Sequence, residues 1–145
     1  MYIVAMHSYT WVLLRPPVGD IDATVRALIL PHRDVEEPFK IGRYDYSTVG
    51  DDTIADPETA AALGVADDEY LRGNVCFVSR LEGKPFPSVV VTPDGAWHDL
   101  LDFGWTFRIR ETPKGLDAWD RWVGKVKDLL AAHADCVAVE IDTHH

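Results

Sequence analysis

The stretch from Pro87 to Arg110, PSVVVTPDGAWHDLLDFGWTFRIR, holds the clearest strand–turn–strand pattern of the chain. Ser88 to Thr92 is short, apolar and rich in β-branched residues, which is typical of a buried strand. The following Pro93-Asp94-Gly95 has the composition of a turn, because proline presets φ and glycine accepts a positive φ. Ala96 to Leu100 is expected to return as the second strand, so the stretch predicts a β-hairpin.

The end of the same stretch, from Phe103 to Arg110, alternates between apolar and polar residues. Such alternation is typical of a strand that has one face on a hydrophobic core. We therefore predict a further strand here, in which four residues face the core: Phe103, Trp105, Phe107 and Ile109.

Two more apolar segments, Tyr2–Leu14 and Cys136–Thr143, are predicted to be strands near the two ends of the sequence. They are among the most apolar segments, so we expect them to be neighbours in one sheet. Both faces of the first segment are largely apolar, which suits a central strand covered on each side, or in part by a partner chain.

Helical spacing of apolar residues predicts two helices. The first begins near Ile21, where Asp20 can cap its N-terminus, and it ends near Pro31. The second begins near Leu116 and carries the strongest apolar stripe of the chain: Trp119, Trp122, Val123, Val126, Leu129 and Leu130.

The middle of the chain is predicted to hold two strands on either side of an insertion. Ile41–Val49 and Asn74–Arg80 are the strand candidates, and Asp51–Gly73 is the insertion. Asp56-Pro57 inside it is a good helix start, because proline at the first helical position loses no hydrogen bond. We therefore expect a short helix within the insertion.

This order of elements predicts one domain over residues 1–145, since the length and the 47% hydrophobic content suit a single core. Strands mixed with two helices favour an α+β fold. We expect a two-layer sandwich with a ferredoxin-like β-α-β-β-α-β core, an extra β-hairpin and the short helical insertion. In that arrangement both helices cover the same face of the sheet.

The charge of the chain limits its partners. It has 24 Asp and Glu against 14 Lys and Arg, a formal net charge of −10, and such a surface repels the phosphate backbone of duplex nucleic acid. No apolar run approaches the roughly 18 residues of a membrane span. The two cysteines, Cys76 and Cys136, lack metal-type spacing and suit a reduced compartment. We expect a cytoplasmic protein that binds neither duplex nucleic acid nor membrane.

Four motifs follow one another in the second half of the chain: Thr92–His98, TPDGAWH; Gly104-Trp105; Leu129–Asp135, LLAAHAD; and Val137–His144, VAVEIDTH. In this order they resemble a family of small uncharacterised actinobacterial and actinophage proteins with TPDGxWH, GW, LLxxHPD and VVDCH motifs. Many members also carry a GGRW-like run, which corresponds here to Ile41–Tyr44. The chain lacks the cysteine-rich insertion of many members. The resemblance implies a phage-type origin and brings no known activity.

Aromatic and charged residues of these segments are the candidates for a ligand site. Aromatic rings on a sheet can stack on a ligand ring, and guanidinium groups neutralise phosphates. His98 follows the tight turn, while Asp142 and His144 share one face of the last strand, so we expect one patch approached by Arg43. The predicted ligand-binding residues are Arg43, Trp97, His98, Trp105, Arg108, Asp142 and His144.

The sequence therefore favours a small non-enzymatic binding protein, a homo-oligomer that sequesters a nucleotide-derived or other small anionic signal. We assign no catalytic residue, no cofactor and no metal ligand. One alternative is a phosphodiesterase or other hydrolase that uses His98 with His7 or His144 as an acid–base pair. Another alternative is an acidic inhibitor that binds a basic host protein.

Overall fold

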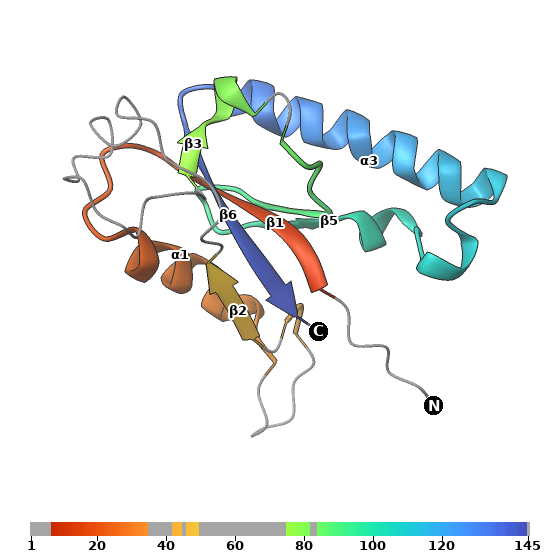
Figure 1. The fold of residues 1–145 in the computed structure, drawn as a ribbon, viewed down its shortest axis with the longest axis horizontal. Coiled ribbons are helices and arrows are strands. Elements are labelled where there is room, and N and C mark those ends of the chain that lie inside the picture. Colours follow the sequence, from red (N-terminus) through yellow and green to blue (C-terminus); the bar gives the residue numbers. More distant parts are fainter. Residues whose placement is uncertain (1–6, 35–41, 45, 50–74, 82–83, 145) are drawn as a thin grey trace.

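The structure is a computed structural model that describes residues 7–34, 42–44, 46–49, 75–81 and 84–144. The start of the first predicted strand, at 2–6, lies outside these residues. So does the insertion predicted at 51–73, with its short helix. The described residues form a mixed α+β fold in which one sheet lies between two helices (Figure 1).

The sheet contains six strands: β1 (His7–Leu14), β2 (Tyr46–Val49), β3 (Val75–Phe77), β4 (Val89–Val91), β5 (Trp97–Asp99) and β6 (Val137–His144). Its order is β2-β6-β1-β4-β5, and β3 also pairs with β6. The central pair, β1 and β6, is antiparallel along all its residues, from His7 opposite His144 to Leu14 opposite Val137. The prediction that the first and last strands are neighbours is confirmed.

The hairpin predicted around Pro93-Asp94-Gly95 is also present, because β4 and β5 pair antiparallel. The Gly95 N–H donates to the Thr92 carbonyl at 2.8 Å, and Gly95 has a φ of 84°. The Thr92 hydroxyl donates to the Asp94 carboxylate inside the turn. β4 also runs parallel to β1, which makes the hairpin an extension of the central pair.

β2 and β3 are two halves of one edge strand. Both run antiparallel to β6, and they pair with successive parts of it: Val49 lies opposite Ile141, and Val75 lies opposite Val139. A single position, opposite Glu140, separates the two halves. β2 and β3 therefore lie one after the other along the same edge of the sheet.

The two helices are α1 (Ile21–Ile29) and α3 (Pro113–Ala132). The Asp20 carboxylate accepts a hydrogen bond from the Ala23 N–H, so the predicted N-cap of α1 is confirmed. Thr112 caps α3 in the same way through the Gly115 N–H, and α3 therefore begins before the predicted Leu116.

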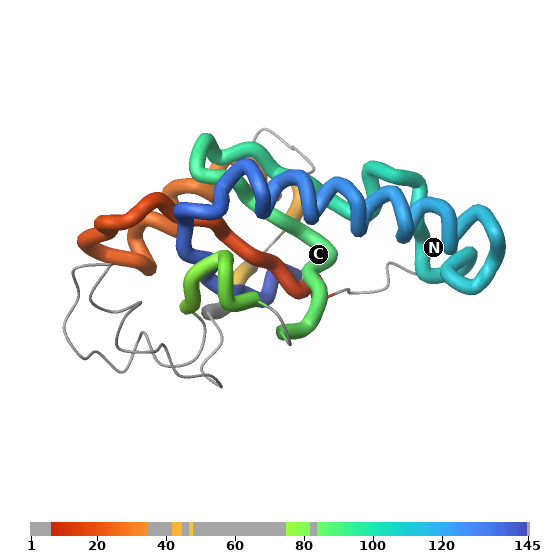
Figure 2. Tube along the Cα trace, turned by 90° about the horizontal axis from the view of Figure 1, so that it is seen from above, coloured from red at the N-terminus to blue at the C-terminus, as the bar shows by residue number. Residues whose placement is uncertain are grey.

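The helices cover opposite faces of the sheet. Val12 of β1 packs in the cluster that contains α1, whereas its neighbour Leu13 packs in the cluster that contains α3. Figure 1 shows α3 and α1 on the two sides of the strands. Figure 2 shows α3 crossing over the strands, with its N-terminal turns reaching beyond them. The prediction of a two-layer, ferredoxin-like sandwich with both helices on one face is therefore wrong.

The strand order explains this difference. β1 and β2 are parallel and lie on either side of β6, so α1 connects them across β6. β5 and β6 are also parallel, and α3 connects them across β4 and β1. Connections of this kind are right-handed in nearly all proteins. With this strand order, two right-handed connections place their helices on opposite faces.

The strand predicted from Phe103 to Arg110 is absent. The chain there forms two 3₁₀ turns, Leu100–Phe103 and Phe107–Ile109. The Asp99 carboxylate accepts from the Leu101 N–H and turns the chain away from the sheet, and Gly104 ends the first turn with a φ of 83°. Phe107, expected to face the core, is 62% exposed. The alternation of residues does not decide the structure here, because the chain must leave the sheet to reach α3.

The apolar stripe of α3 packs on the sheet as predicted. Trp122 and Val126 are fully buried, and Leu129 is buried on the same stripe. The indole N–H of Trp122 donates to the Pro87 carbonyl at 2.8 Å, which joins α3 to the start of the hairpin.

We predict that Trp122→Ala lowers the free energy of unfolding by about 3–5 kcal/mol, because the substitution leaves a cavity between α3 and the sheet. Urea denaturation measures this loss. Trp119→Ala is the matched control, because Trp119 is only partly buried on the same helix and should cost less. A loss below about 1 kcal/mol for Trp122→Ala would contradict the packing described here.

The interrupted edge strand predicts that residues 50–74 can be replaced by a single threonine opposite Glu140. The joined strand would keep the register of both halves, and a shorter connection costs less entropy to close. We expect a folded protein whose thermal midpoint is not lowered, as measured by circular dichroism. A two-residue linker is the control, since a one-residue slip turns side chains to the wrong face. An unfolded one-residue variant would refute the prediction.

Candidate anion-binding site

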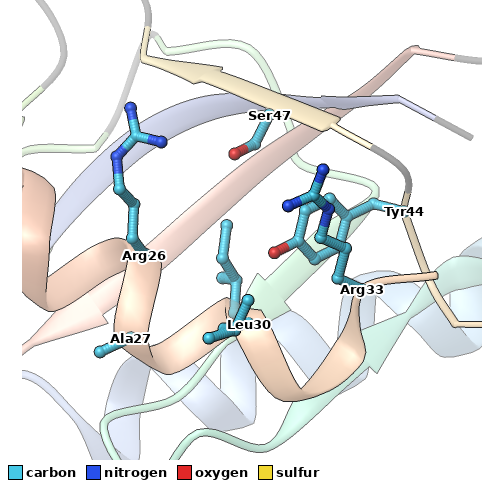
Figure 3. A pocket seen from close by; sticks show the side chains of 7 residues that line it. Arg26, Ala27, Leu30, Arg33, Tyr44 and Ser47 are labelled. Atoms are coloured by element: carbon cyan, nitrogen blue, oxygen red, sulfur yellow. The ribbon is translucent and has the colours of Figure 1, made fainter. Parts of the chain in front are cut away.

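A pocket of about 270 Å³ lies between α1 and β2, on the α1 face of the sheet (Figure 3). Its described lining comes from α1, the segment that follows it, Tyr44 and β2. The lining residues are Arg26, Ala27, Ile29, Leu30, Arg33, Tyr44 and Ser47. In Figure 3 the hydroxyl groups of Tyr44 and Ser47 point into the space between the two arginines.

The helical repeat of α1 brings Arg26 to the pocket. Arg26 lies near Leu30 on one side of the helix because residues four apart are neighbours there. The Arg26 Nε donates to both carboxylate oxygens of Asp22, each at 2.9 Å, and this ion pair orients the guanidinium. Arg33 follows the short 3₁₀ turn Leu30–His32 that extends the helix. The pocket therefore receives two guanidinium groups from one continuous segment.

Tyr44 forms the wall of the pocket beside Arg33 (Figure 3). Its backbone pairs with Arg33 in an isolated parallel bridge, and its carbonyl accepts from the Asp34 N–H at 2.8 Å. The side chain is only 4% exposed. Burial raises the pKa of the Tyr44 phenol, against an opposing effect of Arg33 and Arg26. The phenol therefore stays protonated at neutral pH, as a hydrogen-bond donor.

Hydroxyl groups continue from the pocket along the same face of the sheet. Ser47 lies opposite Thr143 in the β2–β6 register. The Thr143 hydroxyl is bonded to the Thr10 hydroxyl at 3.0 Å, and both residues are fully buried. Arginine groups and hydroxyls thus surround the pocket, while Ala27, Ile29 and Leu30 supply apolar contacts. This chemistry suits a small anion that also has an apolar part.

Two of the predicted ligand residues, Arg43 and Trp97, lie behind the pocket wall. The Trp97 ring is parallel to the Tyr44 ring, with a centroid distance of 5.8 Å and an interplanar angle of 2°. The Arg43 guanidinium donates to the Asp102 carboxylate at 2.8 and 3.2 Å. Neither residue is among those that line the pocket. They support Tyr44, which the sequence analysis did not select.

The patch predicted from His98, Asp142 and His144 is not formed. His98 and His144 share the α3 face, but β4 and β1 lie between their strands, and three strand spacings amount to roughly 14 Å. Asp142 and His144 instead meet His7 of β1. The His7 Nδ1 is 2.8 Å from an Asp142 carboxylate oxygen, and the His7 and His144 rings are 4.9 Å apart. A pair of His98 with His7 or His144 is therefore not assembled.

The last two predicted residues, Trp105 and Arg108, lie away from the pocket. Trp105 is half-buried and packs against the cluster on the α3 face. Arg108 is exposed on the turn Phe107–Ile109. Sequence reasoning missed Arg26, Arg33 and Ser47. The spacing of Arg26 and Arg33 along one predicted helix and its extension was the available signal, but exposed helical arginines are common.

Within the described ranges, no group of three or more His, Cys, Asp or Glu side chains is arranged to hold a metal ion. The helices of the same ranges include none with the length and hydropathy needed to cross a membrane. Comparison of the chain with protein-family models, curated proteins and solved structures gave no match.

His98 gives the α3 face a pH-dependent contact. Burial lowers the pKa of the His98 imidazole, and nearby Lys125 lowers it further. The ring lies 3.4 Å from the Thr92 hydroxyl. Below an ordinary histidine pKa of about 6.5, the unfolded chain takes up a proton that the folded chain resists. His98 therefore costs stability as the pH falls.

We predict that His98 contributes a decrease in the free energy of unfolding between pH 7.5 and pH 5.5, so that His98→Asn loses less stability than the wild type over this range. Urea denaturation at the two pH values measures both slopes. If the free energy of unfolding changes equally with pH in the variant and the wild type, His98 is not responsible for the pH dependence.

Proposed function

We propose that this protein binds, without converting it, a small anionic molecule in the pocket between α1 and β2. The observation that carries the proposal is that Arg26, Arg33 and Tyr44 line one cavity of about 270 Å³. Guanidinium groups match phosphate and carboxylate oxygens in shape as well as charge. The neutral phenol adds a donor that does not repel an anion.

The charge of the whole chain favours a small ligand over a polyanion. With a formal net charge of −10, the surface repels a long phosphate backbone, whereas a local arginine such as Arg33 can attract one anionic group. The volume of about 270 Å³ is slightly below the usual range of small-molecule pockets, which begins at about 300 Å³. A mononucleotide or a smaller phosphorylated molecule therefore fits the pocket better than an oligonucleotide.

Sequestration of a nucleotide-derived signal is the biological role that we propose. The described lining supplies donors and apolar contacts, which serve recognition, and the resemblance to actinophage proteins suggests a signal used in host defence. A cytoplasmic location is part of this proposal, because such signals are found inside the cell. We also propose a homo-oligomeric state.

We predict that the wild-type protein binds AMP and inorganic phosphate, and that Arg33→Gln weakens both by about 10-fold or more. A hydrogen bond to a charged group contributes about 1.5–3 kcal/mol, and about 1.4 kcal/mol corresponds to a tenfold change. Isothermal titration calorimetry measures the affinities. Arg108→Gln is the matched control, since it removes the same charge from an exposed position outside the pocket lining.

The proposal fails if the wild type binds neither compound, or if Arg33→Gln and Arg108→Gln behave alike. Incubation of the wild-type protein with phosphodiester substrates, followed by analysis for products, tests the hydrolase alternative. The His7–Asp142–His144 group would then be the place to look for the acid and the base, because it is where two imidazoles meet a carboxylate.

A further inference from the structure

Tyr44 and Arg33 form one wall of the pocket, and this wall is built from two short segments held together by their backbones. The Arg43 N–H donates to the His32 carbonyl, and the Asp34 N–H donates to the Tyr44 carbonyl. Gly42 lies so close to this junction that a Cβ there would collide with the His32 carbonyl oxygen. The two segments therefore move as one unit.

Side chains fix this unit to the β4–β5 hairpin at two points. The Tyr44 ring stacks on Trp97, and the His32 ring lies 5.4 Å from the same indole. His32 Nε2 also forms a hydrogen bond with the Gly95 carbonyl oxygen at 2.7 Å. The hairpin motif that begins at Thr92 thus supports the pocket wall from behind.

Arg43 provides the third attachment. Its guanidinium forms a two-pronged ion pair with Asp102 and lies 3.8 Å from the Asp99 carboxylate. Asp99 is only 3% exposed, and its oxygens also accept from the Trp97 indole N–H at 3.1 Å and the Leu101 N–H at 2.9 Å. Arg43 and Trp97 therefore share one buried carboxylate. Because Arg43 precedes Tyr44 in the chain, this ion pair acts directly on the wall.

We propose that Arg43 is a positioning residue for ligand binding. Its ion pairs with Asp102 and Asp99, together with the Trp97–Tyr44 stack, hold Arg33 and Tyr44 in the geometry that receives the anion. This inference rests on the proposed function of the pocket. It deepens that function, because it makes affinity depend on a side chain that lies outside the lining.

The Arg43–Asp102 ion pair is partly exposed to solvent, and this exposure allows a positioning role to be distinguished from a purely structural one. The Arg43 and Asp102 side chains are 38% and 44% exposed, and an ion pair of this kind contributes little to folding. The buried Asp99 carboxylate lies farther from Arg43, at 3.8 Å, and keeps the N–H donors of Trp97 and Leu101 when Arg43 is replaced. In metal sites, groups that orient a ligating side chain typically change metal affinity by about 10-fold or more, and we expect a similar effect on anion affinity here. Loss of Arg43 should therefore reduce anion affinity much more than it reduces stability.

The test measures inorganic phosphate binding by calorimetry, and the thermal midpoint, for a set of variants. Arg43→Gln should weaken phosphate binding by about 10-fold while the midpoint stays close to that of the wild type. Arg43→Lys should restore part of the affinity, because it keeps the charge and loses the two-pronged geometry. Asp102→Asn should weaken binding as well. The double variant Arg43→Gln/Asp102→Asn should lose less binding free energy than the sum of the two single losses, because both substitutions remove the same ion pair.

The outcomes distinguish this inference from the proposal on which it rests. If Arg33→Gln weakens phosphate binding and Arg43→Gln leaves it unchanged, the pocket binds anions and the positioning role is overturned. A parallel loss of affinity and midpoint in Arg43→Gln, with no rescue by lysine, would also overturn it in favour of a structural role. If the wild type binds neither phosphate nor AMP, both are overturned. Arg108→Gln again controls for the change in net charge.

Discussion

The antiparallel pairing of β1 with β6 is the constraint on which the remaining structure depends. It joins segments from near the two ends of the sequence over eight residues on each strand. The β4–β5 hairpin extends the pair on one side, and the split edge strand of β2 and β3 extends it on the other. Because β1 and β6 have buried residues on both faces, two separate layers of helix are needed to cover them.

This two-sided burial shows what the sequence could and could not predict. The apolar character of both faces of Tyr2–Leu14 indicated a central strand covered on each side, and the structure agrees for the described part of that segment. The placement of both helices on one face was nevertheless wrong. Helix spacing defines which side of a helix is apolar, but the face it covers depends on strand order. Strand order depends on long-range pairing, which a single sequence does not reveal.

The candidate site was predicted in part, for a similar reason. Arg43 and Trp97 were chosen for their chemistry, and both lie within the group that supports the pocket wall. The lining arginines were missed because their role depends on β2 passing alongside α1. His98 and His144 were grouped because His98 follows a tight turn and His144 shares one face of the last strand with Asp142. Two intervening strands separate them, and the register instead brings His7 to Asp142.

The split edge strand has a consequence for how this protein can change over time. Val49 and Val75 are two pairing positions apart on β6, which corresponds to roughly 7 Å along a strand. Any segment whose own ends lie that close together can be inserted there without altering the central pair or either helix. This edge is therefore a site where insertions, deletions or replacements of sequence are compatible with the fold. Relatives of this chain could differ greatly in length while keeping the same sheet, and a foreign domain could be grafted at this point.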